Sequence, residues 1–309
     1  MNRNTKSEDP VSRQKVGILG LGLMGTAFAT NLLNKGYSVH VYDRKEVKAR
    51  PLVHSGAVFH RTPRELGEEV DIAITALTDE VAVRQVVTGK AGLLGGMKKG
   101  GLWVEMSTID PDESTRLSQE AKLSGIERLD APVVGIASQA REGKVILLAG
   151  GDKGLFRKHK HFLSDLGSQV IYLGKDANGH KMKLVINMYM SVVGLAYAEA
   201  LVLARKLGFP PGVFADTLNR TPHRNVYTEG RGPRVEFDNY SPMFTLKNLA
   251  KDVRLAGKQA RKSGAFIPVS SLAAQIYAAA LEEGLGEEDF SVVTSVVKKL
   301  SGMPSKSVR

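Results

Sequence analysis

Short apolar runs and longer amphipathic stretches alternate along the first half of the chain. The runs are rich in β-branched residues, which is typical of strands, and the stretches between them show helical spacing. We predict strands at 16–19, 38–42, 57–60, 71–77, 102–106, 145–150 and 169–173. Strands that alternate with helices indicate an α/β fold with a mostly parallel, doubly wound sheet.

This alternation stops near Gly174, and the apolar spacing beyond it is helical. We predict helices at 180–207, 210–218, 226–237, 245–263, 270–283 and 289–300. The expected parts are a disordered extension at 1–14, an α/β domain at 15–176 and an all-helical domain at 177–309. Ligands of open α/β sheets bind outside the carboxyl ends of the strands, so the cleft between the domains is the expected active site.

The first strand–helix–strand unit, at 15–44, contains a glycine-rich turn. Gly20, Gly22 and Gly25 follow the first strand with GxGxxG spacing, and Asp43 ends the second strand. Gly20 permits a tight turn, Gly22 lets the backbone approach a pyrophosphate, and Gly25 lets the helix pack closely. The N–H groups and dipole of the helix N-terminus would face the phosphates. This context predicts a Rossmann-type, dinucleotide-binding domain.

Composition and charge exclude fewer classes of function than the hydrophobic pattern and the glycine motif do. The 309 residues are 42% hydrophobic and include no cysteine, which excludes disulfides and thiolate metal sites. With no apolar run long enough to cross a bilayer and no signal peptide, we expect a cytoplasmic enzyme without a metal or a membrane partner. The net charge of +11 comes from scattered basic residues, which favours a solvated surface over nucleic-acid binding.

Four segments carry polar side chains at places suited to chemistry. They are 105–108, which ends a predicted strand, 130–135, which we expect to be another strand end, and 179–187 and 244–252, which open predicted helices. The i, i+4 spacing places Lys183 and Asn187 on one face of the long helix. A lysine in a partly desolvated cleft can have its pKa lowered toward neutrality and serve as a general acid or base. A surface lysine and a buried, hydrogen-bonded asparagine would show the same pattern.

These segments, in this order and spacing, resemble the β-hydroxyacid dehydrogenase family, which includes 3-hydroxyisobutyrate dehydrogenase and glyoxylate/succinic semialdehyde reductase. The resemblance covers about 16–300. Its markers are GLGLMG at 20–25, Ser107-Thr108, DAPV at 130–133, the Gly179/Lys183/Asn187 helix and Lys251-Asp252. It implies an NAD(P)-dependent oxidoreductase that interconverts a small β-hydroxyacid and its semialdehyde or keto acid, and a homodimer or homotetramer.

The resemblance also implies roles for individual residues. Lys183 is the implied catalytic residue, and Asn187 holds the substrate oxygen or orients the lysine. The implied cofactor-binding residues are Gly20, Leu21, Gly22, Leu23, Met24, Gly25, Asp43, Arg44, Leu77, Thr108 and Lys251. The candidate substrate-binding residues are Val134, Gly135, Asn225 and Asp252. Asp252 is expected to pair with Lys251 or Lys247, or to lie on the helix surface.

One segment departs from the family pattern. Many members follow DAPV with Ser-Gly-Gly or Ser-Gly-Ser, whose hydroxyl and N–H groups hold the substrate carboxylate, whereas this chain has Val134, Gly135 and Ile136. One hydrogen bond is lost and the pocket becomes more apolar, so substrate identity stays open. Ser138, Arg224 or Asn225 are candidates to supply the missing contact.

The cofactor is NAD or NADP, and the residues favour NAD. Asp43 suits the two ribose hydroxyls of NAD and repels the 2′-phosphate of NADP, whereas Arg44 and Lys45 could clamp that phosphate. Two other functions compete with the dehydrogenase. An imine reductase would share the architecture but usually lacks the catalytic lysine, and a non-catalytic dinucleotide-binding scaffold would not need Lys183.

Overall fold

The computed structural model describes residues 14–303, so the predicted extension at 1–14 lies almost wholly outside the described residues. Packing divides the chain into two units, Met1–Lys183 and Leu184–Arg309. The division falls seven residues after the predicted domain boundary at 176, inside one long helix. The first turns of that helix therefore pack with the α/β unit.

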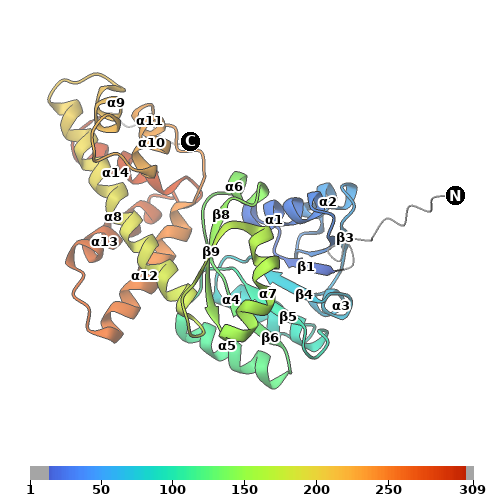
Figure 1. Ribbon diagram of the computed structural model, residues 1–309. Coiled ribbons are helices and arrows are strands. Elements are labelled where there is room, and N and C mark those ends of the chain that lie inside the picture. Colours follow the sequence, from blue (N-terminus) through green and yellow to red (C-terminus); the bar gives the residue numbers. More distant parts are fainter. Residues whose placement is uncertain (1–13, 304–309) are drawn as a thin grey trace. The chain divides into compact units, whose positions relative to one another are not determined.

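The first unit is built on a nine-stranded mixed sheet (Figure 1). Its strands are β1 (Lys15–Leu19), β2 (Ser38–Tyr42), β3 (Val58–Phe59), β4 (Ile72–Thr75), β5 (Leu102–Glu105), β6 (Glu127–Asp130), β7 (Val133–Val134), β8 (Val145–Gly151) and β9 (Gly167–Tyr172). Strands β3-β2-β1-β4-β5-β6 lie side by side in that order and are all parallel. Strand β8 runs antiparallel to β6 and β7, and β9 is parallel to β8. The doubly wound, mostly parallel sheet is confirmed.

Helices cover both faces of this sheet. They are α1 (Leu23–Asn34), α2 (Arg50–His54), α3 (Pro63–Glu69), α4 (Glu80–Thr88), α5 (Pro111–Leu123), α6 (Ala137–Arg141) and α7 (Lys153–Leu166), with short 3-10 helices η2 (Glu46–Lys48) and η3 (Leu93–Gly95). Side chains that alternate along β5 enter two cores. Val104 packs in the core that contains Phe28 and Phe162, and Trp103 packs in the core that contains Leu66 and Val83.

Several short elements lie between the predicted strands. Pro51 lies in the first turn of α2, where its missing N–H costs nothing. Helix α6 and strand β7 were not predicted, because each is too short to show a period.

The second unit is helical over its described residues, 184–303. Its helices are α8 (Asn178–Lys206, which begins in the first unit), α9 (Val213–Asn219), α10 (Val226–Gly230), α11 (Gly232–Glu236), α12 (Leu246–Ser263), α13 (Pro268–Glu282) and α14 (Val293–Leu300), with the 3-10 helix η4 (Phe290–Val292). The single helix predicted at 226–237 is two short ones, since Pro233 in the first turn of α11 cannot donate a helical hydrogen bond. Leu249, Tyr277 and Phe290 are central to the core.

Helix α8 corrects the expectation that no run could cross a bilayer. Among residues 14–303 it alone is long and apolar enough to do so, by length and composition. Its apolar positions include Leu195 and Leu201, which are buried in the core of the second unit. A core helix that is buried on several faces can be as long and as apolar as a membrane span. The length and composition of α8 are therefore weak evidence for either.

A buried ion pair holds η4 in the second unit. Both the Nε and Nη2 atoms of Arg231 donate to the Asp289 carboxylate, at 2.9 and 3.2 Å, and the guanidinium lies 4.6 Å from the centre of the Phe290 ring. Asp289 also accepts from the N–H groups of Met243 and Phe244. Burial opposes the charge of Asp289, but Arg231 and these hydrogen bonds outweigh it and hold the pKa of the carboxyl below its usual range.

Candidate active site

The glycine-rich turn forms a tight cradle with one open position. Gly20 has φ +100°, and a Cβ there would lie 2.6 Å from the carbonyl oxygen of Ala76. A Cβ on Gly25 would overlap the carbonyl oxygen of Gly20. At Gly22, by contrast, a Cβ would meet no heavy atom of residues 14–303 within 4 Å. The turn therefore leaves space beside Gly22, at the N-terminus of α1, and this fits a pyrophosphate.

Asp43 fastens this turn to the end of β2. Its Oδ2 accepts from the N–H of Leu21 at 2.8 Å, and its Oδ1 accepts from the N–H of Lys45 at 2.9 Å. The ammonium of Lys48 lies 3.4 Å from Oδ2, while Arg44 is exposed. The carboxylate is thus oriented by backbone N–H groups of the protein itself, and it keeps further lone pairs for ribose hydroxyls. Leu23 is exposed and Met24 packs on the core.

A buried carboxylate that the sequence did not single out joins the ends of β4 and β5. Glu105 accepts from the Thr75 hydroxyl at 2.8 Å and from the N–H of Ser107 at 2.6 Å. The hydroxyl of Ser107 in turn accepts from the N–H of Leu77 at 2.9 Å. The Leu77 side chain lies against Gly20, so this predicted cofactor contact does border the cradle. Thr108 follows directly and is half-buried.

The segment that departs from the family pattern turns sharply after β7. Val134 is half-buried and pairs with Ile146. Gly135 has φ +146°, and a Cβ there would lie 2.7 Å from Val145, so the position requires glycine. The N–H of Ile136 donates to the side-chain oxygen of Gln139 at 3.1 Å, which already uses one of the backbone donors expected to bind a substrate carboxylate.

The start of α8 is seated on Asp130 at the end of β6. Asp130 accepts from the N–H of Ala177 at 2.9 Å and from the N–H of His180 at 3.1 Å, so its carboxylate caps the helix. The imidazole Nδ1 of His180 lies 3.3 Å from the same carboxylate. Burial opposes the charge of Asp130, but His180 and Arg128 outweigh it and hold the pKa of this carboxyl below its usual range. Lys183 follows His180 by three residues and is half-buried.

A buried polar network surrounds this cap, and sequence reasoning missed it. Arg128 donates to Asp176 at 2.8 Å and to the hydroxyl of Ser114 at 2.9 Å, and that hydroxyl lies 3.2 Å from Nδ1 of His180. The guanidinium also lies 4.7 Å from the centre of the Trp103 ring. Burial raises the pKa of the Asp176 carboxyl, although Arg128 opposes the rise. Strand β6 reads Glu-Arg-Leu-Asp, so Arg128 stands among other charged residues and gives no distinguishing signal in the sequence.

A second group of predicted residues meets within the helical unit. The amide Nδ2 of Asn187 donates to Oδ2 of Asp252 at 2.6 Å, and the ammonium of Lys251 lies 3.0 Å from Oδ1. Asn187 and Asp252 are both 1% exposed. Asp252 therefore pairs with Lys251, while Lys247 pairs with Glu287 instead. Since a carboxylate offers no donor, Asn187 must turn its NH₂ toward Asp252, so its side-chain oxygen points to other donors.

The loop residues proposed as substitute contacts have other partners. The side-chain oxygen of Asn225 accepts from the N–H groups of Tyr227 and Thr228 at 2.9 and 3.2 Å, so Asn225 caps α10. Arg224 is exposed, with Nε 3.9 Å from Glu229. Ser138 is exposed in α6. The substrate role predicted for Asn225 competes with this capping role.

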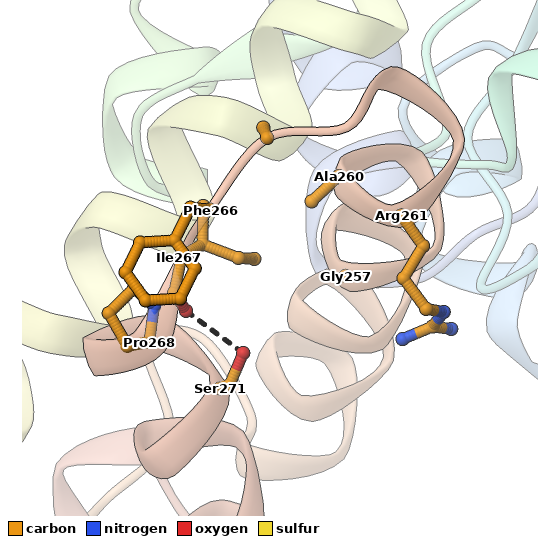
Figure 2. A pocket seen from close by; sticks show the side chains of 8 residues that line it. Gly257, Ala260, Arg261, Phe266, Ile267, Pro268 and Ser271 are labelled. Carbon is orange, nitrogen blue, oxygen red and sulfur yellow. Dashed lines mark hydrogen bonds between the residues drawn. The ribbon is translucent and has the colours of Figure 1, made fainter.

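A shallow hollow of about 200 Å³ lies between the end of α12 and the start of α13 (Figure 2). Arg261 and Phe266 border it from opposite sides, and the Ser271 hydroxyl at its base donates to the carbonyl of Ile267 at 2.9 Å. None of the predicted site residues lines it. Its lining carries no acid or base suited to proton transfer near neutral pH, so it is not the candidate active site.

Two family models together cover most of the chain. The model of the NAD-binding domain of 6-phosphogluconate dehydrogenase matches residues 15–174. The model described as the NAD-binding domain of NADP-dependent 3-hydroxyisobutyrate dehydrogenase matches residues 177–297. The first unit is therefore an NAD(P)-binding domain, as the glycine cradle indicates.

Individual relatives agree with these models over nearly the full chain. Glyoxylate/succinic semialdehyde reductase 1 of Arabidopsis thaliana is 36% identical over 284 residues, which are 92% of this chain and 98% of that protein. Cytokine-like nuclear factor N-PAC of Gallus gallus is 32% identical over 91% of this chain but only 51% of its own length. The crystal structure of a 3-hydroxyisobutyrate dehydrogenase from Salmonella typhimurium superposes with a TM-score of 0.85 at 28% identity, covering 92% of this chain and 99% of that one.

Proposed function

This chain belongs to the family of NAD(P)-dependent 3-hydroxyisobutyrate dehydrogenases and glyoxylate/succinic semialdehyde reductases, and from that membership we propose its reaction. The enzyme interconverts a small β-hydroxyacid and its semialdehyde or keto acid, with Lys183 as general acid and base. The observation that carries the proposal is Lys183 itself, on the first turns of a helix whose start is capped by the dinucleotide-binding unit.

In the proposed reaction the cofactor and the protein residues have different roles. The nicotinamide cofactor supplies or accepts the hydride when it is bound. Lys183 gives a proton to the substrate oxygen during reduction and removes it during oxidation, because hydride transfer at carbon requires a proton to move on the attached oxygen. The side-chain oxygen of Asn187, oriented by Asp252, accepts a hydrogen bond from the lysine or from the substrate hydroxyl. Lys251, paired with Asp252, provides a cation for the cofactor.

The substrate is a small carboxylate with an apolar segment near the reacting carbon. Val134 replaces a serine hydroxyl of the family pattern, and the N–H of Ile136 is already bonded to Gln139. Both facts weaken binding of the most polar semialdehydes and support a branched or methyl-substituted substrate. A rate panel of β-hydroxyacids and ω-semialdehydes tests this, and fastest turnover of glyoxylate would contradict it.

The preferred cofactor in this proposal is NAD. The carboxylate of Asp43 is fixed by the N–H groups of Leu21 and Lys45, so it stays in place to accept from the ribose hydroxyls and to repel a 2′-phosphate. Lys48 and the exposed Arg44 soften this repulsion, which makes some use of NADP expected. Initial rates with NADH and NADPH decide the point.

Replacement of Lys183 by alanine is the central test. We expect loss of turnover by at least a thousandfold with cofactor affinity retained, since the lysine acts on the substrate oxygen. Lys181→Ala is the matched control, because Lys181 is an exposed lysine on the same helix. Unchanged turnover in Lys183→Ala would refute the proposal, whereas absence of turnover in the unaltered protein would favour the scaffold alternative.

The similarity to nuclear factor N-PAC is a reason to test the scaffold alternative directly. That protein is about twice as long as the matched region, and this chain aligns with only 51% of it. A cofactor-binding scaffold would bind NADH but show no turnover with any member of the substrate panel. Self-association as a homodimer or homotetramer is part of the proposal and is tested by sedimentation.

A further inference from the structure

Glu105 ends β5 at the edge of the sheet where α/β proteins bind their ligands. Its side chain is fully buried, and its register partner is Thr75 at the end of β4. Both carboxylate oxygens accept hydrogen bonds, Oε2 from the Thr75 hydroxyl at 2.8 Å and Oε1 from the N–H of Ser107 at 2.6 Å. The carboxylate therefore joins the ends of two neighbouring strands and holds the turn that follows β5.

The two groups that face this carboxylate are both donors. The indole Nε1 of Trp103 donates to the Thr75 oxygen at 2.8 Å, so the Thr75 hydroxyl hydrogen is left to donate onward to Glu105. The backbone N–H of Ser107 can only donate. A carboxylate accepts on both oxygens, whereas the amide of a glutamine accepts on one and a leucine on neither. An acidic side chain is therefore the kind that satisfies both donors.

Ser107 carries the connection from Glu105 to the glycine cradle. Its hydroxyl oxygen accepts from the N–H of Leu77 at 2.9 Å, in the segment that follows β4. This segment forms a wall of the cradle, since a Cβ on Gly20 would lie 2.6 Å from the carbonyl oxygen of Ala76 and 2.7 Å from Cδ2 of Leu77. Because the packing leaves no gap there, a displacement of the wall would move the turn at Gly20.

We propose that Glu105 is a positioning residue for the cofactor, which fixes the wall of the glycine cradle through Ser107 and so sets the affinity for the dinucleotide. Glu105 acts through Ser107 and Leu77 and does not itself contact the cofactor. The inference concerns binding by the NAD(P)-binding unit. It therefore stands apart from the proposed reaction, and loss of turnover in Lys183→Ala neither supports nor weakens it.

The test is fluorescence titration with NADH, together with thermal melts without cofactor, on two graded variants. In Glu105→Leu both donors lose their acceptor, and we expect the dissociation constant for NADH to rise about tenfold. In Glu105→Gln the side-chain oxygen can still accept from the N–H of Ser107, so the rise should stay below about threefold. Rescue by the conservative variant separates the hydrogen-bonding role from the mere filling of space.

Asn31→Leu is the matched control, because it also removes a buried hydrogen bond from the first unit. Asn31 is 3% exposed, and its Nδ2 donates to the carbonyl oxygen of Asp165 at 2.8 Å. At a rise of 1.5 Å per residue, Asn31 lies roughly 12 Å along α1 from Leu23, the first residue of the helix. We expect a lower melting temperature with the NADH affinity unchanged. An equal loss of affinity in this control would overturn the inference.

A double-mutant cycle with Ser107→Ala tests the route from Glu105 to the cradle. Ser107→Ala removes the acceptor of the Leu77 N–H, so it should weaken NADH binding in the unaltered protein. It should add little in Glu105→Leu, because both changes cut one connection. Effects that multiply would overturn the inference, as would normal NADH affinity in Glu105→Leu. If Glu105→Leu does not fold, Ser107→Ala decides alone, and normal NADH affinity in that variant overturns the inference.

Discussion

Replacement of Gly22 by alanine should weaken cofactor binding and leave the stability of the fold almost unchanged. In the described part of the chain no heavy atom lies within 4 Å of the added Cβ, and Gly22 has φ −77°, which alanine adopts without strain. The cost to the free protein is the weaker N-capping of alanine, at most about 1 kcal/mol, which corresponds to a melting-temperature shift of about 2–4 °C or less. The Cβ would occupy the space that we assign to the pyrophosphate.

Cofactor affinity and thermal stability should therefore respond differently to this substitution. We expect the dissociation constant for NADH to rise at least tenfold, about 1.4 kcal/mol, while the melting temperature without cofactor is nearly unchanged. Fluorescence titration with NADH and thermal melts in the absence and presence of cofactor measure both. Gly25→Ala is the contrasting variant, because its Cβ overlaps the Gly20 carbonyl and should damage folding as well as binding. Normal NADH affinity in Gly22→Ala would refute the placement of the phosphates.

Three further predictions concern charged side chains. Asp43→Asn should shift the ratio of kcat/KM values about tenfold toward NADPH, since a repulsive charge is lost; initial rates measure it, and an unchanged ratio would contradict the NAD preference. Asp252→Ala should lower kcat about 10- to 100-fold at saturating cofactor, because Asn187 loses the 2.6 Å partner that orients it; a change of less than twofold would exclude that role. Arg231→Met should cost about 3–5 kcal/mol in urea unfolding at pH 7, since it leaves the Asp289 carboxylate buried without its cation. The pKa of Asp289 is depressed in the folded state, so this contribution is present above the unfolded value near about 3.9 and should shrink as the pH falls below it.

The regular elements of the fold were predictable because their periods are long enough to be read. The strand predicted at 38–42 has the same bounds as β2, and the helix predicted at 245–263 differs from α12 by one residue at its start. The errors in predicted secondary structure fall in segments that are too short, or too interrupted, to show a hydrophobic period. Helix α6 has five residues, and the break between α10 and α11 depends on Pro233 within a stretch that is otherwise helical.

The candidate site was predictable to the extent that its residues belong to local motifs. The glycine cradle follows from a motif in the sequence. Asn187 and Asp252 were each singled out by a motif, but the contact between them joins residues 65 positions apart and was not predicted. The network of Arg128, Ser114 and His180 could not be foreseen, because each residue looks like an ordinary polar position until the strands and helices pack. Asn225 shows the opposite case, since a loop asparagine close to a helix start is as suited to capping as to substrate binding.

The hydrogen bond from the Leu21 N–H to Asp43 has a consequence for the kinetics of cofactor association. This anchor is made by the protein's own backbone and side chain, so we expect that binding does not have to order a loop first. We therefore expect the association of NADH to be a single exponential whose observed rate rises linearly with concentration. A plateau would mean that a conformational step limits entry. If the rate rises linearly, rapid exchange of oxidised and reduced cofactor depends on the Asp43 carboxylate as much as on the glycines.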